Sequence, residues 1–331
     1  MKKILFRSVL GLFGLLIVIV FAFYISPKPG AILIRHLFNS EVKITDKVSF
    51  NRAKANVEVT YNQHYDSDFK DNTYDLYLPK NNNQRLPVLI WVHGGGYVGG
   101  DKEGVKEFAT RLASDAKIAV VSMNYEKAPE SKYPNQLRQV SELVKTLKDE
   151  KLSKLKLDNI ILGGDSAGAQ IALQFALTQT NEQYRDSLKV PQLIKREGIK
   201  ATISYCGPIN LEQLKNTKTS SNFMKFFVRT VAWSELGIKN WKTSSQLKQA
   251  SLVNHLTSEF PPTYITDGNA YSFQEQGLTF KDKLKQLSVP VQSLFFNKTK
   301  KEITHEYQFD YSKSEAKDCY VQTLNFINQY K

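Results

Sequence analysis

The segment that most constrains the fold predicts a buried strand, a tight turn and a helix. Residues 160–162 are apolar, and the residues from Ala169 to Leu177 are apolar enough for a helix packed under a sheet. Between them lies Gly164-x-Ser166-x-Gly168, whose glycines allow a sharp turn that exposes the serine hydroxyl at the carboxyl edge of the sheet. The helix N-terminus beside it favours developing negative charge. Ser166 is therefore a candidate nucleophile, although small residues also form ordinary turns.

Further apolar segments extend this pattern along the chain. Strands are expected at 88–92, 118–123, 201–205, 263–266 and 291–296. Helical periodicity is expected around 105–113, 137–147 and 316–327. Buried strands that alternate with helices predict an α/β fold with a mostly parallel sheet covered on both faces, and sites in such sheets lie at the carboxyl ends of the strands. Alternating residues at 57–61 and 74–78 predict two half-exposed antiparallel strands at one edge.

One insertion breaks this alternation. Residues 209–260 are too many for a plain crossover between two strands. Five of them, Phe223, Met224, Phe227, Val228 and Val231, fall on one face of an expected helix. This helix could be a lid that lines an apolar pocket, or it could simply pack on the domain for stability.

A glycine-rich loop follows the strand at 88–92. It reads His93-Gly94-Gly95-Gly96, and its glycines would leave backbone N–H groups free to bind an anion. A phosphate-binding loop would need Gly-Lys-Ser/Thr, which is missing here. Alone, the segment would be taken as a flexible turn. Beside a serine nucleophile it suits an oxyanion hole.

Three strings together resemble the hormone-sensitive-lipase-like esterase/lipase family of the α/β-hydrolase superfamily. They are His93-Gly94-Gly95-Gly96, the stretch from Tyr125 to Glu130, and Gly164-Asp165-Ser166-Ala167-Gly168, and the resemblance covers roughly residues 50–331. It implies an α/β-hydrolase fold with a helical cap and a serine carboxylesterase or lipase-like activity on short acyl or acetyl esters. It implies no cofactor and no metal. By position, the oxyanion donors would be the backbone N–H groups of Gly95, Gly96 and Ala167.

The remaining triad members are expected on two later loops. His305 follows the last strand, where the base stands in the chain order serine, acid, histidine. Asp267 directly follows the strand at 263–266, although aspartate before glycine is also common in turns. The family's acid usually lies a few residues later, where this chain has Tyr271, and Glu275 and Asp282 lie further into the next helix. Asp267 is the predicted acid.

The N-terminus predicts a membrane anchor. Lys2, Lys3 and Arg7 precede an apolar run from Val9 to Ile25 that is long enough to cross a bilayer and lacks a small-residue cleavage site. The expected organisation is an anchor at 1–28 and a catalytic domain at 29–331, with the cap at about 209–260. The basic flank predicts a single-pass protein of the cell membrane with its catalytic domain outside the cell. A cleaved signal peptide is the alternative.

The net charge and the two cysteines limit which partners and cross-links are expected. The net charge is +13, with one denser patch at Lys145, Lys148, Lys151, Lys154 and Lys156. On a tethered domain this patch would favour anionic head groups or envelope polymers, or it is a solvated basic face. No interleaved aromatic and basic pattern suggests nucleic acid. Cys206 and Cys319 are expected to be buried thiols.

The predicted substrate is a small-molecule or lipid ester. Two alternatives are an exopeptidase of the same superfamily and a catalytically silent, membrane-anchored binding module. The first would need an acidic site for the substrate amine, which the sequence does not offer. The second would be signalled by loss of Ser166 or His305, and both are present. The sequence does not set the oligomeric state.

Overall fold

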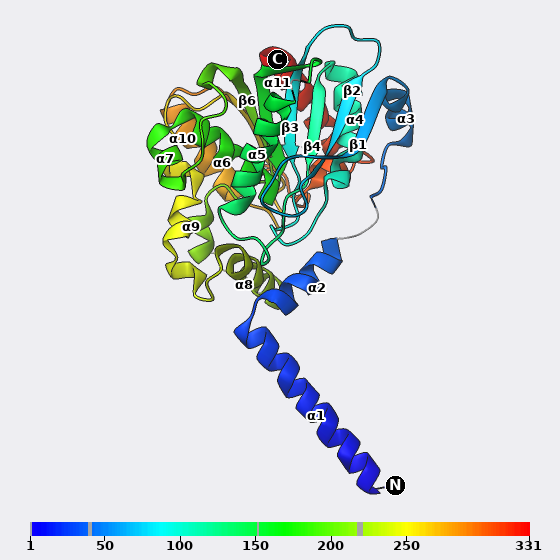
Figure 1. Ribbon diagram of the computed structural model, residues 1–331, viewed down its shortest axis with the longest axis vertical. Coiled ribbons are helices and arrows are strands. Elements are labelled where there is room, and N and C mark those ends of the chain that lie inside the picture. Colours follow the sequence, from blue (N-terminus) through cyan, green and yellow to red (C-terminus); the bar gives the residue numbers. More distant parts are fainter. Residues whose placement is uncertain (1, 39–41, 151, 217–220) are drawn as a thin grey trace.

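The strands form one eight-stranded sheet in the order β1-β2-β4-β3-β5-β6-β7-β8 (Figure 1). The computed structural model describes residues 2–38, 42–150, 152–216 and 221–331. β2 pairs antiparallel with both β1 and β4, and all other neighbours are parallel. The strands are β1 (Val57–His64), β2 (Thr73–Pro79), β3 (Leu86–Val92), β4 (Ala119–Met123), β5 (Leu155–Asp165), β6 (Ile199–Tyr205), β7 (Thr263–Asp267) and β8 (Val291–Phe295).

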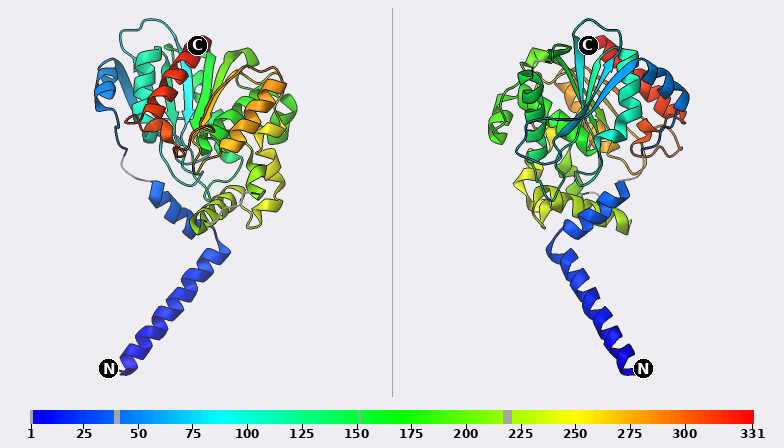
Figure 2. Two further views of the ribbon diagram at one scale, coloured as in Figure 1. Left: turned by 180° about the vertical axis from the view of Figure 1, so that it is seen from behind. Right: turned by 45° about the vertical axis from the view of Figure 1, so that its right-hand side comes forward.

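Helices cover both faces of this sheet (Figure 2). One face packs on α5 (Asn135–Asp149), α6 (Ala167–Thr180) and α10 (Gln274–Gln286), whose apolar residues share one core cluster. The other face packs on α4 (Lys106–Ala116) and α11 (Ser314–Tyr330), which form a second cluster. The predicted α/β-hydrolase fold class, with a mostly parallel sheet covered on both faces, is confirmed.

The insertion between β6 and β7 is helical. It contains α8 (Asn222–Leu236) and α9 (Ser245–Gln249), with short 3-10 turns before, between and after them. These elements lie at the carboxyl ends of the strands, over the end of the sheet where β5 turns into α6 (Figure 1). This is the place expected for the cap.

The N-terminal helix α1 (Lys2–Ile25) stands away from the domain (Figures 1 and 2). The most apolar 18-residue window of its segment Lys3–Ile25 has a mean hydropathy of 2.7, and none of that window is buried. Such a helix fits either a membrane anchor or a signal sequence. The next helix, α2 (Lys28–Phe38), packs against α8.

Two predictions about local structure need correction. β2 is not half-exposed: it is buried on both faces because β1, not β2, is the edge strand. Finally, α3 (Lys47–Ala55) and α7 (Glu182–Leu188) were not predicted. Both are short, and the periodicity of a short helix is weak.

Two other predictions can be placed on the structure. Cys206 and Cys319 are buried free thiols, as expected. The basic patch runs from the end of α5 to the start of β5, at the opposite end of the sheet from α1 and α8, and Lys151 lies outside the described residues. Lys145 pairs with Asp149, and Lys148 donates a hydrogen bond to the carbonyl oxygen of Leu193. The patch therefore lies away from the end of the molecule that carries α1 (Figure 1).

Candidate active site

Ser166 lies in a strained turn between β5 and α6. Its φ of 48° is in the left-handed region, which non-glycine residues rarely adopt, and its N–H donates to the carbonyl oxygen of Tyr205 at 2.8 Å. The flanking glycines are required for this turn. A Cβ on Gly164 would lie 2.5 Å from the carbonyl carbon of Gly168 and 2.6 Å from the carbonyl oxygen of Val92. The side chain of Ser166 is thereby held at the carboxyl edge of the sheet.

His305 reaches this serine from the loop after β8. The Ser166 hydroxyl and His305 Nε2 are 3.0 Å apart, within hydrogen-bond distance. The loop is fixed beside the end of β7, since Ala270 and Thr304 form an isolated bridge and His305 N–H donates to the Ala270 carbonyl oxygen. The two residues are 139 positions apart in sequence, so the sheet topology brings them together.

Asp267 lies behind His305 at the end of β7. Its Oδ1 is 3.6 Å from His305 Nδ1, longer than a hydrogen bond, and Nδ1 has no other hydrogen-bond partner in the described part of the chain. Catalytic hydrogen bonds are often long in the absence of substrate. The carboxylate itself is fixed, because it accepts 2.7 Å bonds from the N–H groups of Gly268 and Phe273. Tyr271, at the family's usual acid position, is 72% exposed.

The electrostatics of His305 depend on these surroundings. Burial by itself lowers the pKa of the imidazole, but the Asp267 carboxylate, followed by Glu306 and Asp165, outweighs this effect, so the pKa is raised. A raised pKa stabilises the imidazolium that forms when a base accepts the proton of a serine. The arrangement can therefore act as a general base.

The glycine loop packs against the serine turn. Gly95 and Gly96 have positive φ values of 116° and 59°, which glycine adopts without strain. Among the described residues, their N–H groups donate no hydrogen bond. Ala167 is the first residue of α6, so its N–H lacks an intrahelical partner as well. The structure thus brings together the three residues expected to form the oxyanion hole.

A buried aspartate that the sequence analysis did not single out holds this loop in place. Asp165 accepts 2.7 Å hydrogen bonds from the Gly94 N–H and from Nε1 of Trp91. Burial, together with the nearby Glu306, raises the pKa of Asp165 to about 7. Asp165 stands inside the Gly-x-Ser-x-Gly string, but the pattern does not reveal what its side chain contacts.

His93 braces the loop from the other side. It is buried, its Nδ1 lies 2.6 Å from the Gly94 carbonyl oxygen, and its ring stacks on Tyr125 with centroids 4.5 Å apart. Burial lowers the pKa of His93 to about 4, so the ring is neutral near pH 7. These contacts brace the glycine loop.

An apolar cavity of about 240 Å³ opens at Ser166. The α8 side chains that the sequence placed on one helical face line it, together with Phe38 of α2. α8 is therefore a pocket-lining helix. Glu235, also on α8, lies in this lining and is buried, with one carboxyl oxygen accepting from Nε2 of Gln136 at 3.1 Å. Burial raises the pKa of the Glu235 carboxyl well above its ordinary value, which favours its protonated form.

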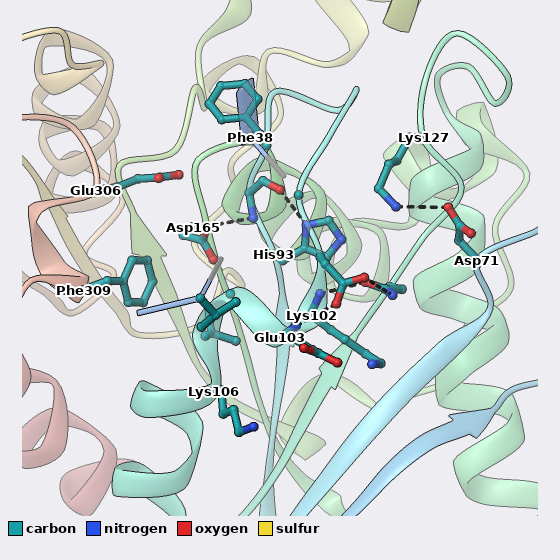
Figure 3. Close-up of a pocket in the computed structure, with 18 of the residues that line it drawn as sticks. Phe38, Asp71, His93, Lys102, Glu103, Lys106, Lys127, Asp165, Glu306 and Phe309 are labelled. Atoms are coloured by element: carbon teal, nitrogen blue, oxygen red, sulfur yellow. Dashed lines mark hydrogen bonds and ion pairs between the residues drawn. The ribbon is translucent and has the colours of Figure 1, made fainter. Parts of the chain in front are cut away.

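A second, polar cavity of about 910 Å³ lies on the other side of the glycine loop and shares Phe38, Gly95 and Glu306 with the first. Figure 3 shows Asp165, Glu306 and Phe309 along one side of it, with Lys127 and Asp71 on the other. Lys102 in its wall is buried and pairs with Asp75 at 3.0 Å. The glycine loop therefore has the apolar cavity, which Ser166 lines, on one side and the polar cavity on the other.

One group of possible metal ligands occurs among the described residues: Cys206, His305 and Glu306. Burial raises the pKa of the Cys206 thiol well above its ordinary value, which disfavours the thiolate that a metal would bind. His305 is already engaged with Ser166. This group does not fit a metal site well.

The eight-stranded sheet, the helical cap and the serine turn define an α/β-hydrolase. Residues 74–284 match the BD-FAE family, and the chain belongs to that family. The expected membership of the α/β-hydrolase esterase families is thereby confirmed.

The relatives agree with this assignment. The chain is 26% identical over 220 residues to an α/β-hydrolase of Acanthamoeba polyphaga mimivirus, covering 65% of this chain and 60% of the relative. It is 24% identical over 209 residues to an esterase of Fusarium pseudograminearum, covering 62% and 61%. The chain thus spans about three-fifths of the length of these relatives. The structure of esterase B from Lactobacillus rhamnosis has the same fold, with a TM-score of 0.68, 19% identity and coverage of 85% and 90%.

Proposed function

We propose that the chain is a serine esterase that hydrolyses carboxylic esters with short acyl groups. The observation that carries this proposal is the 3.0 Å approach of Ser166 Oγ to His305 Nε2 at the floor of an apolar cavity. Membership of the BD-FAE family and relatives named as esterases support it.

In the proposed mechanism, His305 accepts the Ser166 proton as Oγ attacks the ester carbonyl. Asp267 orients the imidazole and stabilises its protonated form. The N–H groups of Gly95, Gly96 and Ala167 stabilise the oxyanion. His305 then protonates the leaving alcohol, and water repeats the attack on the acyl-enzyme. No step requires a cofactor.

The two cavities suggest how the ester is oriented. The apolar cavity suits the acyl group, and its volume of about 240 Å³ lies below the usual range for ligand pockets, which favours a short chain. The polar cavity suits the alcohol part, because it lies across the glycine loop and carries several charged side chains.

The test uses the full-length protein in detergent micelles and a fluorophosphonate probe. The wild type is expected to be labelled and to hydrolyse p-nitrophenyl acetate and butyrate faster than decanoate. Ser166→Ala should lose both labelling and hydrolysis while keeping its circular dichroism spectrum. Ser272→Ala, which changes a serine outside the proposed machinery, is the matched control. Unlabelled wild type would favour a binding module instead, and labelling that persists in Ser166→Ala would place the nucleophile elsewhere.

We further infer that α1 stays attached and holds the catalytic domain outside the cell membrane. The support is the charge of Lys2, Lys3 and Arg7 before the apolar segment. Protease added to intact protoplasts should digest the domain while a cytoplasmic marker stays intact. Protection of the domain, or a soluble form that begins near residue 26, would contradict this topology.

A further inference from the structure

Helix α2 has two apolar faces, and only one of them is covered by protein. Gly30, Ala31 and Ile34 are buried against the domain. On the outward side, Ile32, Leu33 and Leu37 are 53%, 49% and 55% exposed. These three exposed apolar side chains are here called the α2 strip. An exposed strip on a helix that directly follows a hydrophobic segment is typical of a helix lying in a membrane interface.

The neighbouring cap helix supplies the other features of such an interface. Phe226 of α8 contacts Phe23 of α1, with ring centroids 6.4 Å apart, and Phe223 at the start of α8 is 54% exposed. Lys225 and Arg229 are exposed on α8, and among the described residues neither pairs with a carboxylate. Cations beside exposed apolar residues match the charge of anionic lipid head groups.

The junction between α1 and the domain also combines an exposed aromatic side chain with a basic one. Tyr24 is 62% exposed near the end of α1, and Lys239 Nζ lies 3.2 Å from the centroid of its ring. Aromatic and basic residues gather where a membrane-spanning helix enters the head-group region. Figures 1 and 2 show that α1 leaves the molecule from the end that carries α2 and α8. A bilayer crossed by α1 would therefore lie against the α2 strip.

The apolar cavity lies at this same end. Phe38 from α2 and Phe227 from α8 both line it, and their rings are in edge contact with centroids 6.0 Å apart. Phe223, which also lines the cavity, is stacked near Phe227 at 6.3 Å. The walls of the cavity thus continue into the exposed apolar surface of the two helices.

We infer that the α2 strip and Phe223 dock on an anionic lipid bilayer and that the ester reaches Ser166 from that bilayer. This inference deepens the proposed esterase function, on which it rests, by naming a membrane-dissolved ester as the substrate class. The cavity would then be supplied from the lipid phase, while the polar cavity stays on the aqueous side of the glycine loop.

Docking is tested on the full chain, reconstituted in vesicles of phosphatidylcholine with and without phosphatidylglycerol. A cysteine at position 33, introduced by Leu33→Cys, is labelled with an environment-sensitive fluorophore. Both native cysteines are buried, so labelling is selective. The matched control is Val321→Cys, which is 53% exposed on α11, a helix that packs on a face of the sheet. Lipid-borne nitroxide quenchers should quench the probe at 33 and not at 321. Equal quenching by an aqueous quencher at both positions would overturn the inference.

Substrate delivery is tested with the double variant Leu33→Gln/Leu37→Gln, which leaves every residue of the proposed site unchanged. Hydrolysis of water-soluble p-nitrophenyl acetate should be retained. Hydrolysis of an ester dissolved in the vesicles should fall roughly tenfold or more, because the docking surface has lost apolar contact with lipid. Val321→Gln is the control. Equal retention of both activities would overturn the delivery step.

The outcomes separate this inference from the esterase proposal. If the wild type hydrolyses neither ester, the proposed function fails, whereas quenching at position 33 still reports on docking. If the α2 strip instead pairs two copies of the chain, the probe at 33 will be shielded from lipid and aqueous quenchers alike. A cross-linked dimer would then appear through position 33, and the docking inference would be wrong.

Discussion

Replacing Asp267 by asparagine tests which carboxylate supports the candidate base. The Asp267 Oδ1–His305 Nδ1 distance is 3.6 Å. At an effective dielectric constant of about 20, two unit charges at that separation attract by roughly 5 kcal/mol. Each 1.36 kcal/mol in a barrier is about a factor of ten in rate, so complete loss of this stabilisation would slow turnover by about 10³–10⁴. In a serine protease with a Ser-His-Asp triad, the same aspartate-to-asparagine change also favours the wrong imidazole tautomer and lowers turnover by about 10⁴.

The assay is steady-state hydrolysis of p-nitrophenyl butyrate across a range of pH. Asp267→Asn should lower kcat by about 10² or more with KM little changed. Activity needs neutral His305, so it rises as pH passes the pKa of the imidazole. Because Asp267 raises that pKa, its removal should shift the acidic limb of kcat/KM to lower pH. Glu275→Gln is the control, since Glu275 is exposed on α10.

Asp267 would not be the supporting carboxylate if Asp267→Asn kept nearly full activity and an unshifted pH profile. Glu306 and Asp165 also raise the pKa of His305, so Glu306→Gln and Asp165→Asn belong in the same series. A larger loss of kcat in Glu306→Gln than in Asp267→Asn would move the acid to the loop after β8.

Two further predictions concern stability. Gly164→Ala should lower the unfolding free energy by about 1–3 kcal/mol in denaturant titrations, because its Cβ would overlap the turn; Gly104→Ala, with nothing within 4 Å, should be nearly neutral. Glu235→Gln should stabilise the protein increasingly as pH rises above the ordinary glutamate value of 4.5. The folded chain keeps the Glu235 proton over a range in which the unfolded chain has lost it, so wild-type stability falls there with rising pH. Parallel melting curves of wild type and variant across pH would contradict this.

The sequence predicted the parts of the fold that depend on local periodicity. Apolar runs predict the buried strands β3–β8, and flanking glycines predict the turn at Ser166. Both signals are local, so each segment can be predicted without knowing the rest of the fold. The burial of β2 could not be predicted in this way, because it depends on β1 occupying the sheet edge.

The site was predictable to the extent that its residues stand at strand ends. The order of the predicted strands placed three residues at one end of the sheet: Ser166, His305 and Asp267. The structure brings these residues together. Their catalytic roles remain predictions. Asp165 and Glu235 could not be assigned from sequence, because their partners come from distant segments. The hydrogen bond from Trp91 to Asp165 spans 74 positions, and that from Gln136 to Glu235 spans 99.

Helix α2, which follows α1, is also held to the glycine loop through Arg35. Its guanidinium donates to the carbonyl oxygens of Val98 at 2.6 Å and Ala128 at 3.0 Å, and it pairs with Glu130 at 2.8 Å. Val98 follows the glycines of that loop by two positions. An N-terminal truncation made to remove α1 should therefore keep α2. A truncated protein that begins before α2 keeps the Arg35 contacts with the loop. One that begins after Phe38 would lose them, and with them the support of the loop that carries the proposed oxyanion donors Gly95 and Gly96.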